Sequence, residues 1–97
     1  MVTDAAEIWR NCFRKWPADL ERRGVLVTSF GEQIPFDGFA TTEELLLIER
    51  RAPDTVGART VIVAFQSIQA LKIVDVAKAK AFQSMGFTAP APAARKP

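Results

Sequence analysis

The sequence predicts a small, mainly β domain, in which one N-terminal helix precedes five short strands with a bend in the second. The chain has 97 residues, which suits a single domain. Apolar residues make up 48% of it, so a core can form without disulfides or a metal. After residue 23, short β-branched and apolar runs alternate with turn signals that contain glycine or proline. We therefore expect one domain over 1–87, with the strands over 24–76.

Residues 4–16 are predicted to form an amphipathic helix. Asp4 is a suitable N-cap, and Glu7 follows three positions later, as in a capping box. Pro17 ends the helix because it lacks an N–H and restrains the residue before it. The segment PADLERRG is then expected to add a helical turn or two, with Gly24 as a left-handed exit. The helix has one apolar face, made of Ile8, Trp9, Cys12, Phe13 and Trp16.

Three strands are expected after the helical region, with the sequences VLVTSF, QIPFDGFA and LLLIERRA. In the second of these, the alternation places Phe36 on one side and Phe39 on the other. Pro35 indicates an edge or a bulge at its position, because proline cannot donate to a sheet ladder. Gly38 indicates a bend or a close backbone approach. The following segment, PDTVGA, is predicted to be a loop.

The segment 60–74, TVIVAFQSIQALKIV, is almost entirely apolar and rich in β-branched residues, which favour strands over a helix. It is too long for one strand of typical length, about 5–6 residues. We therefore predict two strands, RTVIVA and IQALKIV, that meet at a tight corner at Phe65, Gln66 and Ser67.

The end of the chain has two parts. Residues 76–85 are expected to form a short helix that stops at Gly86, or to continue the last strand. Residues 88–97 are rich in proline and alanine and are predicted to be a disordered tail.

The composition argues against several function classes. The sequence has no histidine and one cysteine, so it lacks the commonest metal ligand, the commonest general base and a cysteine zinc site. Cys12 is interpreted as a small buried hydrophobic residue. No apolar run reaches the roughly 20 residues that span a bilayer. We therefore expect a cytoplasmic protein that is not an enzyme, with no catalytic or metal-binding residues, no cofactor, no membrane association and no identified small-molecule substrate.

The segment 24–49, GVLVTSFGEQIPFDGFATTEELLLIE, resembles the first motif of the Sm/Lsm superfamily, which includes the bacterial Hfq family of RNA chaperones. The matching features are the apolar first strand, Gly31 in the first turn and Gly38 at the bend. The segment 63–68 is similar in spacing to the second motif, although Ala64-Phe65 stand where that motif has Arg-Gly. The resemblance implies a strongly bent, five-stranded Sm-like (SH3-like) barrel over 24–76. It also implies a homo-oligomer joined along the fourth and fifth strands, for which a closed ring is one arrangement. It also implies single-stranded RNA as a partner.

The candidate RNA-binding residues fall into two groups. Basic side chains at a strand entry and a strand exit are expected to hold phosphates, and the turn between the last two strands is expected to meet bases. These residues are Arg22, Arg23, Arg50, Arg51, Phe65, Gln66 and Ser67. The structural alternatives are that the arginines are solvated strand ends and that Phe65 belongs to the core.

RNA binding by the oligomer is the function expected first, and a scaffold that binds protein but no nucleic acid is the alternative. The net charge of +2 permits a nucleic-acid partner without requiring one. The positions of the arginines distinguish the two. Arginines gathered on one face favour RNA, whereas arginines that each pair with a neighbouring acidic residue favour the scaffold.

Overall fold

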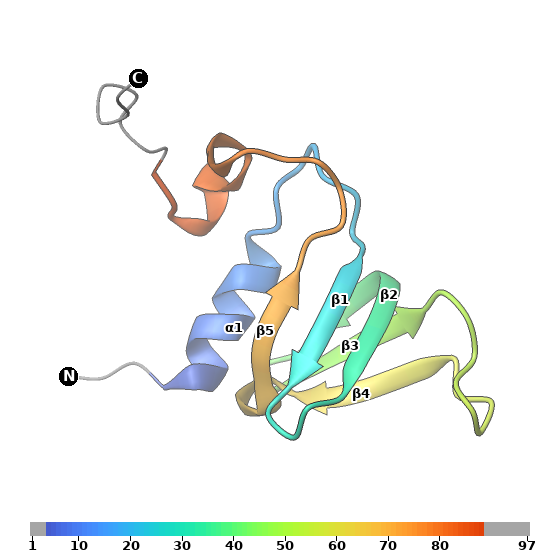
Figure 1. Cartoon of the computed structure of the whole chain (residues 1–97). Helices are drawn as coiled ribbons and strands as arrows, with labels where there is room; N and C mark the ends of the chain where they lie inside the picture. The colour runs from blue at the N-terminus through green and yellow to red at the C-terminus, as the bar shows by residue number, and fades with distance from the viewer. Residues whose placement is uncertain (1–3, 89–97) are drawn as a thin grey trace.

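The computed structural model describes residues 4–88 of the chain (Figure 1). It contains one α-helix, five strands and two short 3-10 helices. Their bounds are α1 (Ala5–Arg14), β1 (Gly24–Thr28), β2 (Gln33–Thr41), β3 (Leu45–Arg50), β4 (Thr60–Ala64), η1 (Phe65–Ser67), β5 (Ile68–Lys72) and η2 (Ala79–Met85). The tail expected at 88–97 lies, apart from Thr88, outside the described residues.

All five strands belong to one antiparallel sheet in the order β4-β3-β2-β1-β5. The two strands at its outer edges, β4 and β5, are consecutive in the chain and are joined by η1 alone. The sheet therefore has to bend strongly so that its two edges approach each other at η1 (Figure 1). The predicted mainly β fold, with five strands in a bent sheet and an N-terminal helix, is confirmed.

The corner predicted in the apolar segment is present. Ala64 and Ile68 have extended backbone conformations, and the three residues between them form η1. The β-branched residues on either side lie in β4 and β5, as their restricted side chains favour. α1 packs on η1 and on β2, which places the helix over this end of the sheet.

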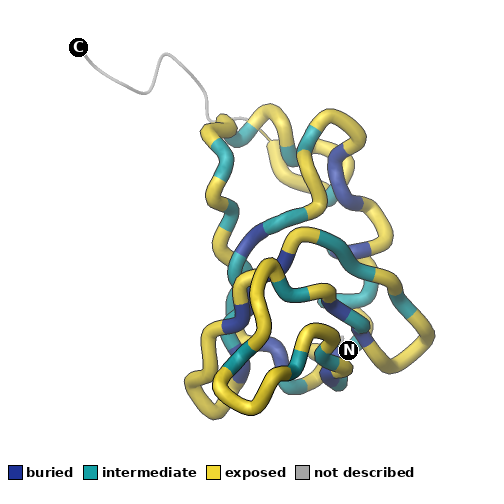
Figure 2. The backbone as a smooth tube through the Cα atoms, turned by 90° about the vertical axis from the view of Figure 1, so that its right-hand side faces the viewer, coloured by how far each residue is buried: buried dark blue, intermediate teal, exposed yellow. Residues whose placement is uncertain are grey.

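The core is centred on an aromatic cluster. Phe13, which is 1% exposed, makes an edge-to-face contact with Phe39, with the ring centroids 5.0 Å apart. Its ring also stacks on Trp16 at 5.7 Å. Figure 2 shows that the buried stretches are short and alternate with intermediate and exposed ones along the chain. The fully buried side chains are Phe13, Phe36, Phe65, Leu26, Ile34, Leu46, Ile48 and Thr28.

A β-bulge in β2 explains two features of that strand. The pairing with β3 shifts register between Phe36 and Gly38. A Cβ atom added to Gly38 would lie 2.6 Å from the Glu49 Oε1 atom. The extra residue reverses the alternation, so Phe39 turns towards the core beside Phe36 and the expectation that it faces away is wrong. β3 pairs with β2 only from Phe36 onward, so Pro35 pairs with β1 and not with β3.

The segment between α1 and β1 is not helical, contrary to expectation. The indole N–H of Trp16 donates to the carbonyl oxygens of Leu20 and Glu21, both at 3.2 Å, so the chain wraps around this side chain. Gly24 is not a left-handed exit either. It is the first residue of β1, and β5 passes so close that a Cβ atom there would lie 2.5 Å from the Lys72 carbonyl oxygen.

The end of the described chain forms a short helix of the 3-10 type and does not continue β5. This helix is η2, and Gly86 ends it with a φ of 103°. The stop predicted at Gly86 is therefore correct, because such a φ is unfavourable for residues with a Cβ atom.

The close approach at Gly24 leads to a prediction about stability. Gly24→Ala should lower the free energy of unfolding by about 1–3 kcal/mol, because the methyl group forces β1 and β5 apart. Urea unfolding followed by circular dichroism would measure the loss. Ser29→Ala is a suitable control, since this exposed side chain should change stability by no more than about 0.5 kcal/mol. Equal stability of the two variants would contradict the close contact.

Candidate functional site

The structure brings the two arginine doublets to the same end of the sheet. Gly24, which follows the first doublet, pairs with Phe36, and Phe36 pairs with Arg50 of the second doublet. Arg59 joins this group, because its carbonyl oxygen accepts a hydrogen bond of 2.7 Å from the Arg50 backbone N–H. Sequence reasoning missed Arg59, although its position just before β4 was a usable signal. This end of the sheet is the first candidate site.

Within this group, Arg22 and Arg23 are engaged with their own chain. The Arg22 Cζ atom lies 4.5 Å from the centroid of the Phe39 ring, which is a cation–π arrangement. Arg23 donates to the Asp75 Oδ1 atom from Nε at 3.1 Å and from a terminal nitrogen at 2.6 Å. The hydrogen bond and the charge of Asp75 raise the pKa of the Arg23 guanidinium. This ion pair ties the start of β1 to the segment that follows β5.

The second doublet is less tightly held. The Nε atom of Arg50 donates to the Ala52 carbonyl oxygen at 2.9 Å. Arg51 has its Nε atom 3.9 Å from the Asp37 Oδ2 atom, and both side chains are about half exposed. An ion pair of this length between exposed groups contributes little to stability. Two aspartates, Asp37 and Asp75, thus lie among the clustered arginines and reduce the positive field there.

The turn η1 lies away from the arginines, at the other end of β4. Glu49 pairs with Thr60 near the arginines, whereas Leu45 pairs with Ala64 beside η1. A strand rises about 3.3 Å per residue, so the length of β4 separates the two predicted halves of the site. The structure therefore does not join the arginines and the turn into one compact pocket.

Of the three predicted turn residues, one is exposed. Phe65 is 0% exposed and packs on Phe13, so the core interpretation fits and its ring is not accessible for stacking on a base. Ser67 is half-buried, and its carbonyl oxygen accepts from the Ser29 N–H at 2.7 Å. Gln66 is exposed in a polar hollow beside Arg10. Three acidic residues share that hollow, namely Asp4, Glu7 and Glu44.

The outer edge of β4 is a second candidate site. β4 pairs with β3 on one side, and within residues 4–88 no strand pairs with its other side. Ile62 of β4 is 62% exposed, and Phe30, in the turn after β1, is 72% exposed. Both line one shallow hollow together with Ile34 and Val63. An unpaired strand edge with exposed apolar side chains is a favourable surface for pairing with another chain.

Two further observations concern metals and membranes. Among residues 4–88, no group of three or more His, Cys, Asp or Glu side chains is arranged to hold a metal ion. None of the helices in this part of the chain has the length and apolar character needed to cross a membrane.

Comparisons with family models, with curated proteins and with solved structures find no match to this chain. The function therefore has to be inferred from its own residues and geometry.

The loop between β3 and β4, which lies between Arg51 and Arg59, is shaped by Asp54. The Asp54 Oδ1 atom accepts from the Ala58 N–H at 2.8 Å and from the Val56 N–H at 2.9 Å. These hydrogen bonds, of which the one from Ala58 has the larger effect, hold the pKa of the Asp54 carboxyl below its ordinary value.

Acidification should therefore loosen this loop. Because the folded-state pKa is lowered, the carboxylate stabilises the loop fully above the unfolded pKa, about 3.9. That contribution is lost as the pH falls through the lower folded value. The amide NMR shifts of Ala58 and Val56 should report this titration, and Asp54→Asn should abolish it. A midpoint at or above the ordinary aspartate value would contradict the proposed hydrogen bonds.

Proposed function

We propose that this chain is the subunit of a homo-oligomeric scaffold that binds protein partners and assembles through the outer edges of β4 and β5. The observation that carries the proposal is the unpaired edge of β4 with the exposed side chain of Ile62. Pairing this edge with β5 of another copy would satisfy its backbone groups and cover apolar surface. Because the two edges differ, such pairing is head-to-tail and gives either a closed ring or an open fibre.

The predicted Sm-like barrel supports this mode of assembly. An Sm-like subunit is expected to pair along its fourth and fifth strands, and in this chain those strands form the two edges of the sheet. The strand order and the tight turn between β4 and β5 agree with that expectation. We further propose a cytoplasmic location, since the single cysteine cannot form a disulfide within the chain.

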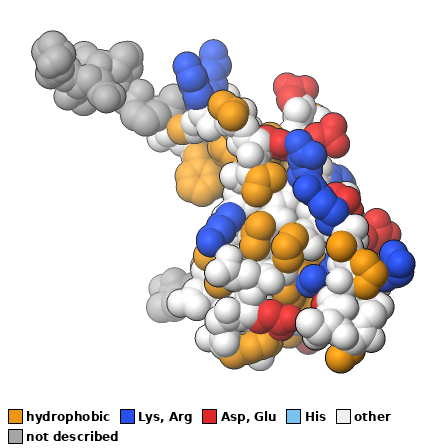
Figure 3. All heavy atoms as spheres, turned by 45° about the vertical axis from the view of Figure 1, so that its right-hand side comes forward, with side chains coloured by type: hydrophobic (Ala, Val, Ile, Leu, Met, Phe, Trp, Pro, Cys, Tyr) orange, Lys and Arg blue, Asp and Glu red, His pale blue; other side chains and the backbone are white. Residues whose placement is uncertain are grey.

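The state of the arginines favours a scaffold over an RNA-binding ring. Arg23 and Arg51 have aspartate partners, and Arg22 lies on an aromatic ring. Phe65, the residue proposed for base stacking, is in the core. On the face shown in Figure 3, acidic and basic side chains are interspersed, so no continuous basic surface is available there for a phosphate backbone.

Oligomerisation is tested by Ile62→Asp. The side chain is 62% exposed, so the subunit should remain folded while assembly is weakened at least tenfold. The reason is that an unpaired carboxylate would be buried in the contact, at a cost of about 1–3 kcal/mol or more. Native mass spectrometry over a range of concentrations would give the subunit number, and circular dichroism would check the fold.

Val56→Asp is the matched control, because Val56 is 86% exposed in the β3–β4 loop and should not affect assembly. An unchanged oligomer mass for Ile62→Asp would rule out the β4 edge as the contact. A wild-type chain that is monomeric at every concentration would refute the oligomer itself.

Single-stranded RNA is the second candidate partner, and one observation favours it. The arginines gather at one end of the sheet, and Arg22, Arg50 and Arg59 have no ion-pair partner among residues 4–88. Edge-to-edge assembly of several copies would repeat this group around the oligomer. A strand of RNA could then contact several subunits through its phosphates.

If RNA binds there, a variant with Arg22, Arg50 and Arg59 replaced by alanine should bind an unstructured oligonucleotide more weakly. Its salt dependence should also be less steep, by about 0.7 in log–log slope for each phosphate that the variant no longer neutralises. Fluorescence anisotropy at several salt concentrations would measure both. Replacing Lys15, Lys78 and Lys80 by alanine gives a control with the same change of charge. Equal salt slopes for the two variants would place the RNA away from these arginines. If the wild-type protein binds no RNA, the scaffold is left as the proposed function.

A further inference from the structure

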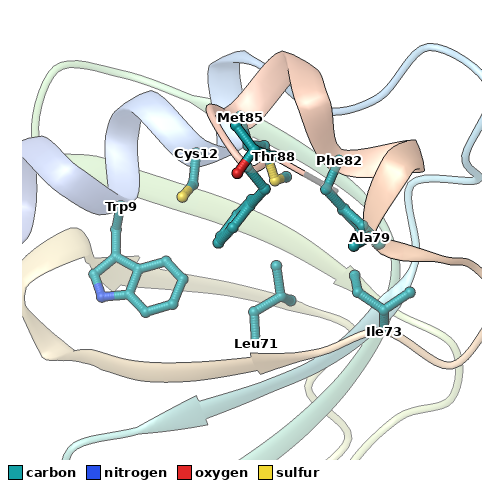
Figure 4. A pocket seen from close by; sticks show the side chains of 9 residues that line it. Trp9, Cys12, Leu71, Ile73, Ala79, Phe82, Met85 and Thr88 are labelled. Atoms are coloured by element: carbon teal, nitrogen blue, oxygen red, sulfur yellow. The ribbon is translucent and has the colours of Figure 1, made fainter. Parts of the chain in front are cut away.

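An apolar cavity of about 400 Å³ lies between α1, β5 and η2 (Figure 4). Each of the three elements supplies part of its wall, and the side chains point towards a common space. The main lining residues are Trp9 and Cys12 from α1, Leu71 and Ile73 from β5 and its continuation, and Phe82 and Met85 from η2. Its volume is within the range of about 300–1,000 Å³ that is usual for small-molecule sites.

The local backbone of each element explains why these side chains share one space. Leu71 and Ile73 are two apart on an extended segment and so lie on the same side, whereas Lys72 between them reaches Gln33 at 3.0 Å. In η2, the lining residues Ala79, Phe82 and Met85 recur every three residues. η2 consists of two short turns that meet at a kink at Phe82 (φ −105°, ψ 22°), and residues three apart on a helical turn are neighbours on one face.

The connection of η2 to the rest of the fold is light. The Ser84 hydroxyl donates to the Lys15 carbonyl oxygen at 2.7 Å, and Met85 packs against the core. Among the residues that the structure describes, no side chain caps the start of η2 at Lys78. A small shift of η2 would therefore widen the cavity without breaking the sheet.

The lining is suited to an alkyl chain and poorly suited to a peptide. Its polar side-chain atoms are the Thr88 hydroxyl and the Cys12 thiol, together with the indole nitrogen of Trp9. Burial raises the pKa of the Cys12 thiol, which therefore stays neutral and acts as part of the apolar wall. The amide groups of a bound peptide would lose their hydrogen bonds with water and find few replacements here.

The charge beside the cavity indicates an anionic head group. Lys78 directly precedes the lining residue Ala79 and is exposed, whereas Lys80 lines a neighbouring hollow with Asp19. The segment 76–88 contains no acidic residue. Asp75, just before it, is already paired with Arg23.

We propose that this cavity binds a free carboxylate with a single alkyl chain of medium length, with the chain between α1, β5 and η2 and the head group at Lys78. All the lining residues belong to one chain, so this proposal does not require the scaffold function, although the cavity shares β5 with the proposed subunit contact. Lys78 gives the site its preference for an anion, and the apolar walls hold the chain.

The full-length protein would be titrated with decanoate, below the concentration at which decanoate forms micelles, by isothermal calorimetry. Saturable binding with one ligand per chain is expected. Cys12 is the only cysteine in the sequence, so its reaction with a thiol reagent reports on the cavity directly. Bound decanoate should slow that reaction at least fivefold. The absence of saturable binding, or an unchanged reaction rate of Cys12, would overturn the proposal.

Two variants locate the ligand. Ala79→Phe fills the cavity and should weaken the binding of decanoate at least tenfold, whereas Ala81→Phe, at an exposed position of the same short helix, should not affect it. Lys78→Gln should weaken the binding of decanoate several-fold and leave the binding of decanol, the uncharged analogue, unchanged.

Three results would overturn the proposal. The first is equal binding of decanoate by the two phenylalanine variants, which would place the ligand outside the cavity. The second is an equal weakening of decanoate and decanol in the lysine variant, which would remove the preference for an anion. The third is binding to vesicles of an anionic phospholipid without saturable binding of decanoate, which would indicate a membrane surface as the partner.

Discussion

The packing of Phe13 against four aromatic rings is the contact on which the rest of the fold depends. Phe13 is the buried residue of α1, and its ring meets Trp16, Phe36, Phe39 and Phe65 at centroid distances of 5.0–6.5 Å. These partners come from the segment after α1, from β2 and from η1. One side chain thus fixes the helix, the middle of the sheet and the corner relative to one another. The wall that α1 contributes to the apolar cavity depends on the same contact.

Much of the fold could be predicted because its signals are local. The β-branched runs, the cap at Asp4 and the corner around Gln66 follow from neighbouring residues alone. The bulge in β2 was also signalled, by Gly38, but its effect on Phe39 was not. One extra residue exchanges the two faces of a strand, and a pattern of alternation does not show where that residue is inserted.

The candidate sites were harder to predict because they depend on contacts between distant parts of the chain. The arginine doublets were recognised as strand ends, but their common location follows from the register through Phe36. Asp75, the partner of Arg23, is many residues away in the sequence, and Asp37, the partner of Arg51, lies at the bulge in β2. The cavity could not be anticipated, because its walls bring α1 together with β5 and η2, which are far from α1 in the sequence.

The rigidity of η1 has a consequence for the size of any assembly. The two outer edges of the sheet belong to one continuous segment, with Phe65 fixed in the core between them. If copies join edge to edge, the angle between these edges determines how far each copy is rotated from the one before. The number of subunits that complete a circle is then set by the curvature of a single three-residue turn. A change of core volume beneath Phe65 would alter that number without altering any residue in the interface.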